Sequence, residues 1–409
     1  MQRMKYIILG GGMVAGYAAK ELTGRGLKSG ELAIISADTA LPYERPPLSK
    51  GFLSGRDDQT SIIINGPEWY RDHGIDVRLN TVIEGIDPNR NLLRSNSGEA
   101  FECQHLLLAT GARARKLDVP GHDLENVFYL RSLRDSESIR SKSASAREAV
   151  IVGGGFIGME VASVLAQKSI PTTLVIREDR VWSRVFTPVI SAFFENYYAS
   201  RGVRIMKQAQ VASLEGKRPV QAVLLGDGKK ISCDLAVVGV GAIPVTELGQ
   251  EAGIKVENGI VVNEYLEASH AGIYAAGDVA NYPDKIFGKR RRVEHWDNAV
   301  SQGQHWARVV LGEKEPFVHV PYFFSDVFDL SYELWGDPAG ASETVVRGDS
   351  NTPSFSVWWL KDNQVSAVFV MNRPDEERRV APEWIKSYQM ISRQRLSDNK
   401  RSVVDAVSG

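Results

Sequence analysis

A glycine-rich turn that occurs twice constrains this chain more than any other feature of its sequence. The copies, at residues 10–16 and 153–158, each come after a short apolar run and before a helical pattern and a second apolar run. Each copy therefore predicts the order strand, turn, helix, strand, and the repeat predicts two domains of one type. The apolar runs are 6–9 and 32–35 around the first turn, and 149–152 and 172–176 around the second.

Glycines at these turns indicate dinucleotide binding. Without side chains, the backbone N–H groups can approach a pyrophosphate, which lies at the positive end of the next helix. The alternative is a tight turn whose glycines serve packing only, but two copies in the same setting favour binding at both. The residues expected to bind are Gly10, Gly12 and Ala15 in the first copy, and Gly153, Gly155, Phe156, Ile157 and Gly158 in the second.

Two such folds in one chain indicate FAD together with NAD(P)H. An acid follows each second apolar run, Asp38 in the first copy and Glu178 in the second, where a carboxylate can bind a ribose hydroxyl. Glu178 would repel the 2′-phosphate of NADPH and favour NADH. Arg177 would instead hold that phosphate, or lie in solvent as a surface charge. We expect a preference for NADH, with NADPH as the alternative.

Length and composition limit the other classes. A chain of 409 residues with 43% hydrophobic residues predicts two to three globular domains. A net charge of −1 argues against nucleic acid as the main partner. Cys103 and Cys233 stand far apart in apolar runs, which predicts buried thiols and neither a disulfide nor a metal site.

The ends of the chain carry further expectations. No apolar run is long enough to span a membrane, and the first strand begins too early to leave room for a signal peptide. We expect a cytoplasmic protein without a membrane partner, unless a longer precursor was trimmed. The polar stretch after about Ile391 predicts a mobile tail.

The chain changes character after about residue 316. The apolar runs 106–111 and 235–241, the second ending at Gly241, each predict a buried strand that closes a nucleotide-binding fold. After about residue 316 aromatic residues become frequent, and the alternation of apolar and polar residues predicts two antiparallel strands with a turn at Asp362 and Asn363. We interpret this part as a third, smaller domain.

Two short segments resemble motifs of flavoproteins that bind two dinucleotides. Residues 108–111 resemble their ATG segment, which implies that Thr110 and Gly111 lie at FAD. Residues 274–278 resemble their second FAD motif, which implies that Gly277 and Asp278 contact the ribityl or pyrophosphate region.

The segment 42–50 resembles the flavin-side loop of monodehydroascorbate reductases and NADH-dependent ferredoxin reductases. The resemblance implies that Arg45, Pro46 and Lys50 contact FAD, and that Lys50 pairs with Glu160. The alternative is that Lys50 and Glu160 are ordinary exposed charges.

The closer resemblance is to monodehydroascorbate reductases, over about residues 5–337. It implies that Glu178 selects NADH and that Glu294, His295 and Trp296 lie by the flavin ring. Hydride transfer to flavin needs no base, so we expect His295 to position groups; the alternative is a packed core histidine. The most specific segments are 30–36, 184–188, 291–295 and 328–332.

Three departures concern the electron acceptor. Segment 61–64 lacks the cysteine of the plant enzymes. Asp326 stands where they carry an arginine thought to bind the ascorbate radical, and a carboxylate repels that anion. Trp358 aligns with their flavin-side tyrosine and resembles the ferredoxin reductase branch.

Two other features bear on the partner. The disulfide reductases need a redox cysteine pair beside the flavin, and neither cysteine here has a partner at such a spacing. The basic run 289–292 would steer an acidic ferredoxin, or else form a solvated turn whose last members contact FAD; we favour the turn.

Together these observations predict an α/β protein with two Rossmann-like domains and a smaller α+β C-terminal domain. The FAD domain is discontinuous, at about 1–115 and 243–315, with the NAD(P)H domain inserted at 116–242 and a flavin-covering domain at 316–409. Nicotinamide is expected to stack on the flavin between the nucleotide domains. The residues expected to take part in catalysis are Lys50, Glu160, His295 and Trp358.

The expected activity is hydride uptake from NADH by FAD, followed by transfer of single electrons. The acceptor is a small organic radical, as in monodehydroascorbate reductase, or an acidic iron–sulfur carrier such as a ferredoxin or rubredoxin. A third hypothesis is a redox-signalling flavoprotein similar to apoptosis-inducing factor. We expect a monomer or a weak dimer.

Overall fold

The computed structural model describes residues 2–408, which form two compact units. Each unit gathers separate stretches of the chain, so neighbours in space are not always neighbours in sequence. The three-domain division expected from the sequence stays a prediction. Unit 1 comprises 2–46, 58–113 and 242–321, and unit 2 comprises 47–57, 114–241 and 322–408.

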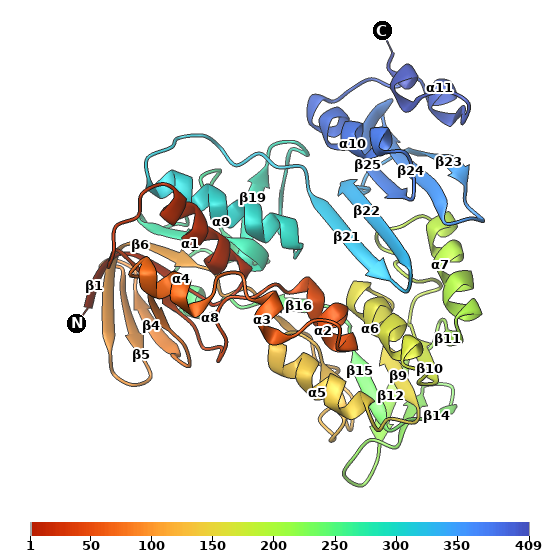
Figure 1. The fold of residues 1–409 in the computed structure, drawn as a ribbon, viewed down its shortest axis with the longest axis horizontal. Helices are drawn as coiled ribbons and strands as arrows, with labels where there is room; N and C mark the ends of the chain where they lie inside the picture. The colour runs from red at the N-terminus through yellow and green to blue at the C-terminus, as the bar shows by residue number, and fades with distance from the viewer. Residues whose placement is uncertain (1, 409) are drawn as a thin grey trace. The chain divides into compact units, whose positions relative to one another are not determined.

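Unit 1 is built on a seven-stranded sheet in the order β3-β2-β1-β6-β5-β4, with β18 also paired to β6. The pairs among β3, β2, β1, β6 and β18 are parallel, and β4 and β5 add an antiparallel edge. Helices α1 and α9 lie side by side (Figure 1). The elements are β1 (Gln2–Leu9), α1 (Met13–Gly24), β2 (Leu32–Ile35), α3 (Gln59–Ile62), α4 (Pro67–Asp72), β3 (Asp76–Arg78), β4 (Ile83–Asp87), β5 (Leu92–Ser95), β6 (Ala100–Leu108), β16 (Ala242–Pro244), α8 (Glu247–Glu251), β17 (Ile260–Val261), β18 (Ile273–Ala275), η2 (Gly277–Val279), β19 (Ala280–Asp284), β20 (Lys289–Arg291) and α9 (Trp296–Val310).

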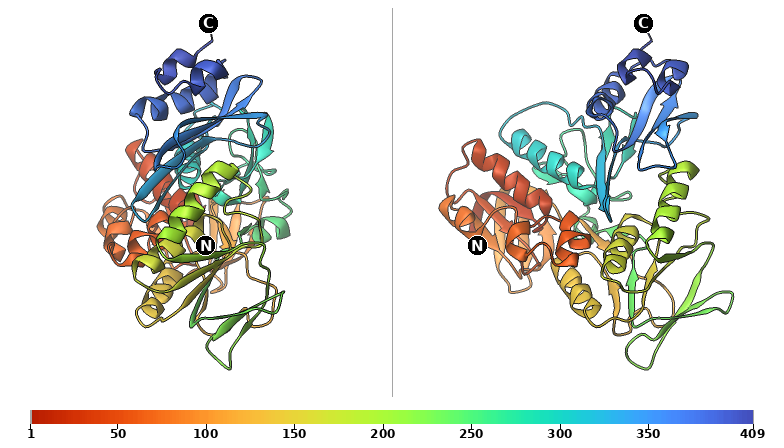
Figure 2. Two further views of the ribbon diagram at one scale, coloured as in Figure 1. Left: turned by 90° about the vertical axis from the view of Figure 1, so that its right-hand side faces the viewer. Right: turned by 45° about the vertical axis from the view of Figure 1, so that its right-hand side comes forward.

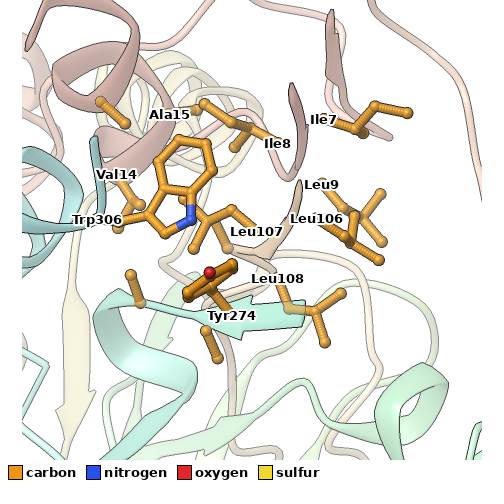
Figure 3. Packing of buried hydrophobic residues seen from close by; sticks show 14 of the residues in the cluster. Ile7, Ile8, Leu9, Val14, Ala15, Leu106, Leu107, Leu108, Tyr274 and Trp306 are labelled. Atoms are coloured by element: carbon orange, nitrogen blue, oxygen red, sulfur yellow. The ribbon is translucent and has the colours of Figure 1, made fainter. Parts of the chain in front are cut away.

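The core of unit 1 lies between this sheet and the two helices. Figure 3 shows Trp306 of α9 and Tyr274 of β18 packed with Val14 and Leu107. The rings of Trp306 and Tyr274 meet edge-on, 6.4 Å between centroids. Because parallel strands are buried on both faces, their sequences are continuous apolar runs, as predicted for β1, β2 and β6.

Unit 2 contains the second dinucleotide fold, a parallel sheet in the order β11-β10-β9-β15-β8. It also contains the antiparallel sheets β12-β13-β14 and β21-β22-β25-β24-β23. Helix α10 packs on the last of these, which Figure 2 shows in blue. The elements are α2 (Gly51–Ser54), β8 (Val127–Tyr129), α5 (Leu133–Ser143), β9 (Ala149–Val152), α6 (Phe156–Gln167), β10 (Thr172–Val175), α7 (Pro188–Ser200), β11 (Val203–Met206), β12 (Val211–Glu215), β13 (Ala222–Leu225), β14 (Lys230–Ser232), β15 (Leu235–Val238), β21 (Tyr322–Val327), β22 (Leu330–Gly336), β23 (Glu343–Asp349), β24 (Ser354–Lys361), β25 (Gln364–Met371), α10 (Asp375–Ser387), α11 (Arg393–Ser397) and η3 (Val403–Ala406).

Two short segments straddle the unit boundaries. They are η1 (Pro46–Ser49) and β7 (Ala112–Ala114), which pairs with β16.

The predicted turn at Asp362 and Asn363 is confirmed. It joins β24 to β25, with Lys361 opposite Gln364, and both turn residues have φ between 51° and 58°. Asp and Asn tolerate this left-handed conformation better than most residues, which is why the pair marks a hairpin.

The prediction of a mobile C-terminal tail is wrong. After Ile391 the chain forms α11 and η3, and a β-bridge joins Ile391 to Val407. Leu396, Val403 and Ala406 are buried. Their spacing among charged residues is too irregular to show a helical or strand period, so composition alone suggested disorder.

Both cysteines are buried, one in each unit. Burial raises the pKa of each thiol, Cys103 and Cys233, to about 12. The thiols are therefore protonated at neutral pH, which is the unreactive state.

Across residues 2–408, every helix is too short or too polar to cross a lipid bilayer.

Candidate cofactor and hydride-transfer sites

The first glycine turn joins β1 to α1 and has the shape of a phosphate cradle. Gly10 has φ +128°, and a Cβ there would lie 2.1 Å from the carbonyl oxygen of Ala109. Around Gly12 the space is open, since the nearest atom to an added Cβ is a guanidinium nitrogen of Arg45 at 3.9 Å. No side chain caps α1, whose first turn packs through the buried Ala15. Bare N–H groups beside a guanidinium fit the pyrophosphate of FAD.

The loop after β2 holds the remaining predicted residues of this region. Asp38 accepts hydrogen bonds from the backbone N–H of Thr39, at 2.7 Å, and from the Tyr43 hydroxyl, at 3.1 Å. The Arg45 guanidinium lies over the Tyr43 ring, 4.7 Å from its centroid, and Pro46 follows at the edge of unit 1. Asp38 therefore shapes its own loop, and its contact with a ribose stays a prediction.

The second FAD motif lies against the first turn. Gly277 has φ +78°, and a Cβ there would lie 2.6 Å from a methyl group of Val14. Its N–H donates to Oε1 of Gln302, at 2.7 Å, and the carbonyl of Asp278 accepts from Arg292 at 3.1 Å. Gln302 is fully buried on α9 and was missed by the sequence analysis, because no motif contains it.

The ATG segment, residues 108–111, is hydrogen-bonded to Val245, which follows β16 where the chain re-enters unit 1. The Thr110 hydroxyl donates to the carbonyl of Val245, at 2.6 Å, and the Val245 N–H donates to the carbonyl of Gly111, at 2.9 Å. Gly111 has φ +67°, a left-handed conformation that favours glycine.

The segment that begins α9 contains a small polar network. Glu44 accepts hydrogen bonds from the Trp296 indole and from the Tyr17 hydroxyl at 2.6 Å. Burial lowers the pKa of His295 to about 4, so its imidazole is neutral at pH 7. A neutral ring that resists protonation suits the positioning role expected for His295. Glu294 is exposed and pairs with Arg292 at 2.7 Å.

The arginines of the basic run 289–292 make contacts within unit 1. Arg290 donates to the carbonyls of Asn281 and Val262, each at 2.7 Å. Arg291 pairs with the buried Asp284 at 3.1 Å. These contacts favour the turn interpretation over a free docking patch.

The second glycine turn joins β9 to α6 in unit 2. A Cβ on Gly153 would lie 2.3 Å from the carbonyl oxygen of Gly239, and one on Gly158 would lie 1.9 Å from that of Gly153. Gly155 has no atom within 4 Å of an added Cβ, and no side chain caps the helix. Gly153 and Gly158 are thus required by packing, whereas Gly155 leaves room for a phosphate. Ile157 is exposed beside it, and Gly241 has φ +111° at the end of the neighbouring strand.

Glu178 follows β10, where the sequence predicts a ribose contact. Its carboxylate lies 3.6 Å from Arg177 and 3.8 Å from Arg184, and both guanidinium groups are well exposed. Arg184 adds a second cation that the sequence analysis did not weigh. The carboxylate therefore stands between two groups that would otherwise hold a phosphate.

We expect Glu178→Ala to lower the preference for NADH over NADPH about tenfold, because it removes a repulsive charge and leaves two arginines unpaired. The ratio of kcat/KM for the two coenzymes measures this effect. Glu215→Ala, which removes the partner of the exposed Lys230 on another sheet of unit 2, is the control. An unchanged ratio in Glu178→Ala would remove the role given to this carboxylate.

Lys50 and Glu160 form the predicted ion pair. Nζ of Lys50 lies 2.7 Å from Oε1 of Glu160, and their side chains are only 12% and 4% exposed. The Ser49 hydroxyl donates to Oε2, and the Ser325 hydroxyl donates to Oε1 at 2.5 Å. Phe324 lies beside Lys50, 5.9 Å from ring centroid to Nζ. The pair is therefore buried, not the exposed charges of the alternative, and its catalytic role stays a prediction.

The two residues on which the expected choice of acceptor depends have opposite environments. Trp358 is fully buried, where its indole donates to Ser356 at 2.9 Å and packs on Trp384 of α10. This environment favours packing, and a role for Trp358 at the flavin stays a prediction. Asp326 is exposed on β21 and accepts a hydrogen bond from Ser331.

Comparisons with known proteins agree with these arrangements. Residues 4–303 match the family model described as pyridine nucleotide-disulphide oxidoreductase, and residues 322–407 match the reductase C-terminal family. The chain is 39% identical to monodehydroascorbate reductase 4, peroxisomal, of Arabidopsis thaliana, over 91% of this chain and 80% of the relative. It is 40% identical to the peroxisomal monodehydroascorbate reductase 1 of Oryza sativa subsp. japonica, over 90% and 82%.

The solved structures include ferredoxin-type reductases. A putidaredoxin reductase in its covalent complex with putidaredoxin has a TM-score of 0.95 and 31% identity, over 99% of this chain and 98% of the other. The ferredoxin reductase for the CYP199A2 system of Rhodopseudomonas palustris has a TM-score of 0.94 and 32% identity, over 99% and 100%. With its two phosphate cradles, the chain belongs to the pyridine nucleotide-disulphide oxidoreductase family, as an oxidoreductase that depends on FAD and NAD(P)H.

Proposed function

We propose that this protein takes electrons from NADH through FAD and passes them singly to an iron–sulfur protein. FAD, when bound, accepts a hydride and releases its electrons one at a time. Gly10, Gly12 and Arg45 would hold its pyrophosphate. Gly153 and Gly155 would hold that of NADH, with Glu178 at the ribose.

The observation that carries the choice of acceptor is Asp326. Its exposed carboxylate lies on β21, at the position where the resemblance to the plant monodehydroascorbate reductases implies an arginine, so it would repel an anionic radical. The likeness in fold to a reductase complexed with putidaredoxin supports an iron–sulfur carrier. Because the arginines of the basic run are used internally, we attribute no steering to them.

Monodehydroascorbate remains a second candidate acceptor. Sequence identity favours it, since the two peroxisomal plant enzymes named above are 39% and 40% identical to this chain over about nine-tenths of its length. The proposal also includes a monomer or weak dimer that works in the cytoplasm without a nucleic-acid or membrane partner.

The test is anaerobic reduction with NADH followed by stopped-flow reoxidation. The reduced protein is mixed with an oxidised [2Fe–2S] ferredoxin in one arm and with ascorbate radical in the other. Faster reoxidation by ferredoxin supports the proposal, and faster reoxidation by ascorbate radical overturns it. If NADH bleaches the flavin but neither acceptor restores it quickly, the signalling hypothesis gains.

We expect Asp326→Arg to raise the second-order rate with ascorbate radical about tenfold at low ionic strength, because a repulsive charge becomes an attractive one. The gain should shrink as salt is added. Glu383→Arg, which reverses an exposed acid on α10, makes the same change in net charge and is the control. A gain of equal size in the control would show that overall charge alone is responsible.

A further inference from the structure

Helix α6 contacts strand β21 and the turn that follows it through ring packing and hydrogen bonds, from Phe156 to Ser163. The ring of Phe156 packs on that of Phe323, 3.8 Å between centroids. One turn further along α6, Glu160 accepts from Ser325, and another turn along, the Ser163 hydroxyl accepts from the N–H of Phe328 at 2.8 Å. All of these residues belong to unit 2.

This contact joins two regions that match different families. Helix α6 starts at the second glycine turn and lies within the pyridine nucleotide-disulphide oxidoreductase match, whereas β21 begins the reductase C-terminal match. The C-terminal segment thus bonds directly to the helix whose first turn is proposed to receive the NADH pyrophosphate.

At the centre of the contact, three donors surround one buried carboxylate. Lys50 and Ser325 approach Oε1 of Glu160, and Ser49 approaches Oε2. A carboxylate bonded at one oxygen only can rotate about its terminal torsion, which has a broad energy well. With Ser325 on Oε1 and Ser49 on Oε2, the plane of the Glu160 carboxylate is fixed. The position of the Lys50 ammonium group, which pairs with this carboxylate, is then fixed as well.

The negative charge of this carboxylate affects the pKa of two buried tyrosine hydroxyls. Burial raises the pKa of Tyr332 and of Tyr198, and the negative charge of Glu160 adds to the rise. The Tyr198 hydroxyl donates to the carbonyl of Met159, at 2.9 Å. Both phenols therefore stay neutral at pH 7 and put no second negative charge beside Glu160, whose carboxylate pairs with Lys50.

We propose that Ser325 is a positioning residue for hydride transfer, acting with Ser49 to hold Glu160 and, through it, Lys50. A residue of the C-terminal segment thereby sets the geometry at the NADH side of the reaction. The inference rests on the proposed hydride uptake from NADH and on the expected part of Lys50 and Glu160 in it, and it does not depend on the identity of the electron acceptor.

The test is Ser325→Ala in the FAD-loaded protein, with no acceptor present. Stopped-flow bleaching of the flavin over a range of NADH concentrations separates the limiting rate, kred, from the apparent Kd for NADH. We expect kred to fall about tenfold with Kd unchanged, because misplaced groups slow a step whose rate depends on orientation. Ser354→Ala removes a hydroxyl that donates to Asn372 on the same sheet and is the matched control.

A second readout does not involve turnover. Amine labelling of the FAD-free protein, followed by mass spectrometry, reports how firmly Lys50 is held relative to the other lysines. We expect faster labelling of Lys50 in Ser325→Ala, and labelling as in the wild type in Ser354→Ala. The double variant Ser49→Ala/Ser325→Ala should deviate from additivity in kred, because both hydroxyls act on one carboxylate.

The outcomes separate the possibilities. Wild-type kred and wild-type labelling in Ser325→Ala would overturn the inference. A fall in kred that comes with a higher Kd, lower thermal stability and an equal effect in Ser354→Ala would also overturn it, by indicating general loss of packing. A wrong acceptor would alter neither readout, so failure of the proposed iron–sulfur partner is recognised separately.

Discussion

Lys50→Met is expected to lower the free energy of unfolding by about 3–5 kcal/mol, because it leaves the Glu160 carboxylate buried without its cation. Ser49 and Ser325 would still donate to the carboxylate, but two hydroxyls do not neutralise its charge. Flavin reduction by NADH is expected to slow about 100-fold, the usual cost of removing a preorganised electrostatic group. Urea unfolding in excess FAD and stopped-flow bleaching measure the two effects.

Two companion variants make this prediction specific. In Lys50→Met/Glu160→Gln the buried charge is gone. The amide oxygen still accepts from one serine and the amide NH2 group can donate to the other hydroxyl, so most of the stability should return while flavin reduction stays slow. Lys230→Met breaks an exposed pair with Glu215, 60% and 38% exposed, and should cost less than about 1 kcal/mol. Equal stability losses for Lys50→Met and Lys230→Met would contradict the argument.

Arg347→Met is expected to lower the free energy of unfolding by about 3–5 kcal/mol and to release residues 392–408, because three backbone carbonyls of this last segment lose their hydrogen bonds to one buried guanidinium. Arg347 is 3% exposed and pairs with Glu377, which is also 3% exposed. It donates to three backbone carbonyls of the segment, those of Leu396, Asp398 and Arg401. Limited proteolysis should then cut after about residue 391, at sites that resist cleavage in the wild type.

Arg373 sharpens the expected result for Arg347→Met. Its guanidinium also contacts Glu377, at 2.8 Å, so the carboxylate keeps one cation and the loss falls mainly on the three carbonyls. Arg393→Met removes an exposed partner of Glu343 in the same segment and should leave proteolysis unchanged. Cleavage of Arg347→Met at the wild-type rate would show that apolar contacts alone hold the segment.

The parts of the fold that the sequence predicted are those encoded within a few neighbouring residues. The runs 6–9 and 149–152 became the last part of β1 and all of β9, since continuous apolar runs suit parallel strands buried on both faces. The glycine turns were predicted because only glycine fits where Gly10 and Gly153 approach a carbonyl oxygen. The hairpin at Asp362 was predicted for a similar reason, a left-handed backbone.

Contacts between distant residues were predicted only where a family resemblance supplied them. The Lys50–Glu160 pair is such a case, and the resemblance placed no serine beside it. Ser49 lies in the segment 42–50, but the resemblance implies no role for it, and Ser325 and Gln302 carried no local signal. A serine hydroxyl has the same sequence pattern whether it faces solvent or a buried carboxylate, so its partner depends on how the chain packs.

By itself, then, the sequence determined two dinucleotide cradles and the strands and helices around them, because backbone conformation and strand burial follow from neighbouring residue types. Only the tertiary structure decided which side chains complete the site. It brought Ser325 to Glu160 across 165 positions. It also packed the buried Trp358 on Trp384 and anchored the polar residues 392–408 on Arg347. Each of these three contacts depends on burial and on hydrogen-bond donors or rings far away in the chain, and the residue types next to one another in the sequence do not determine either.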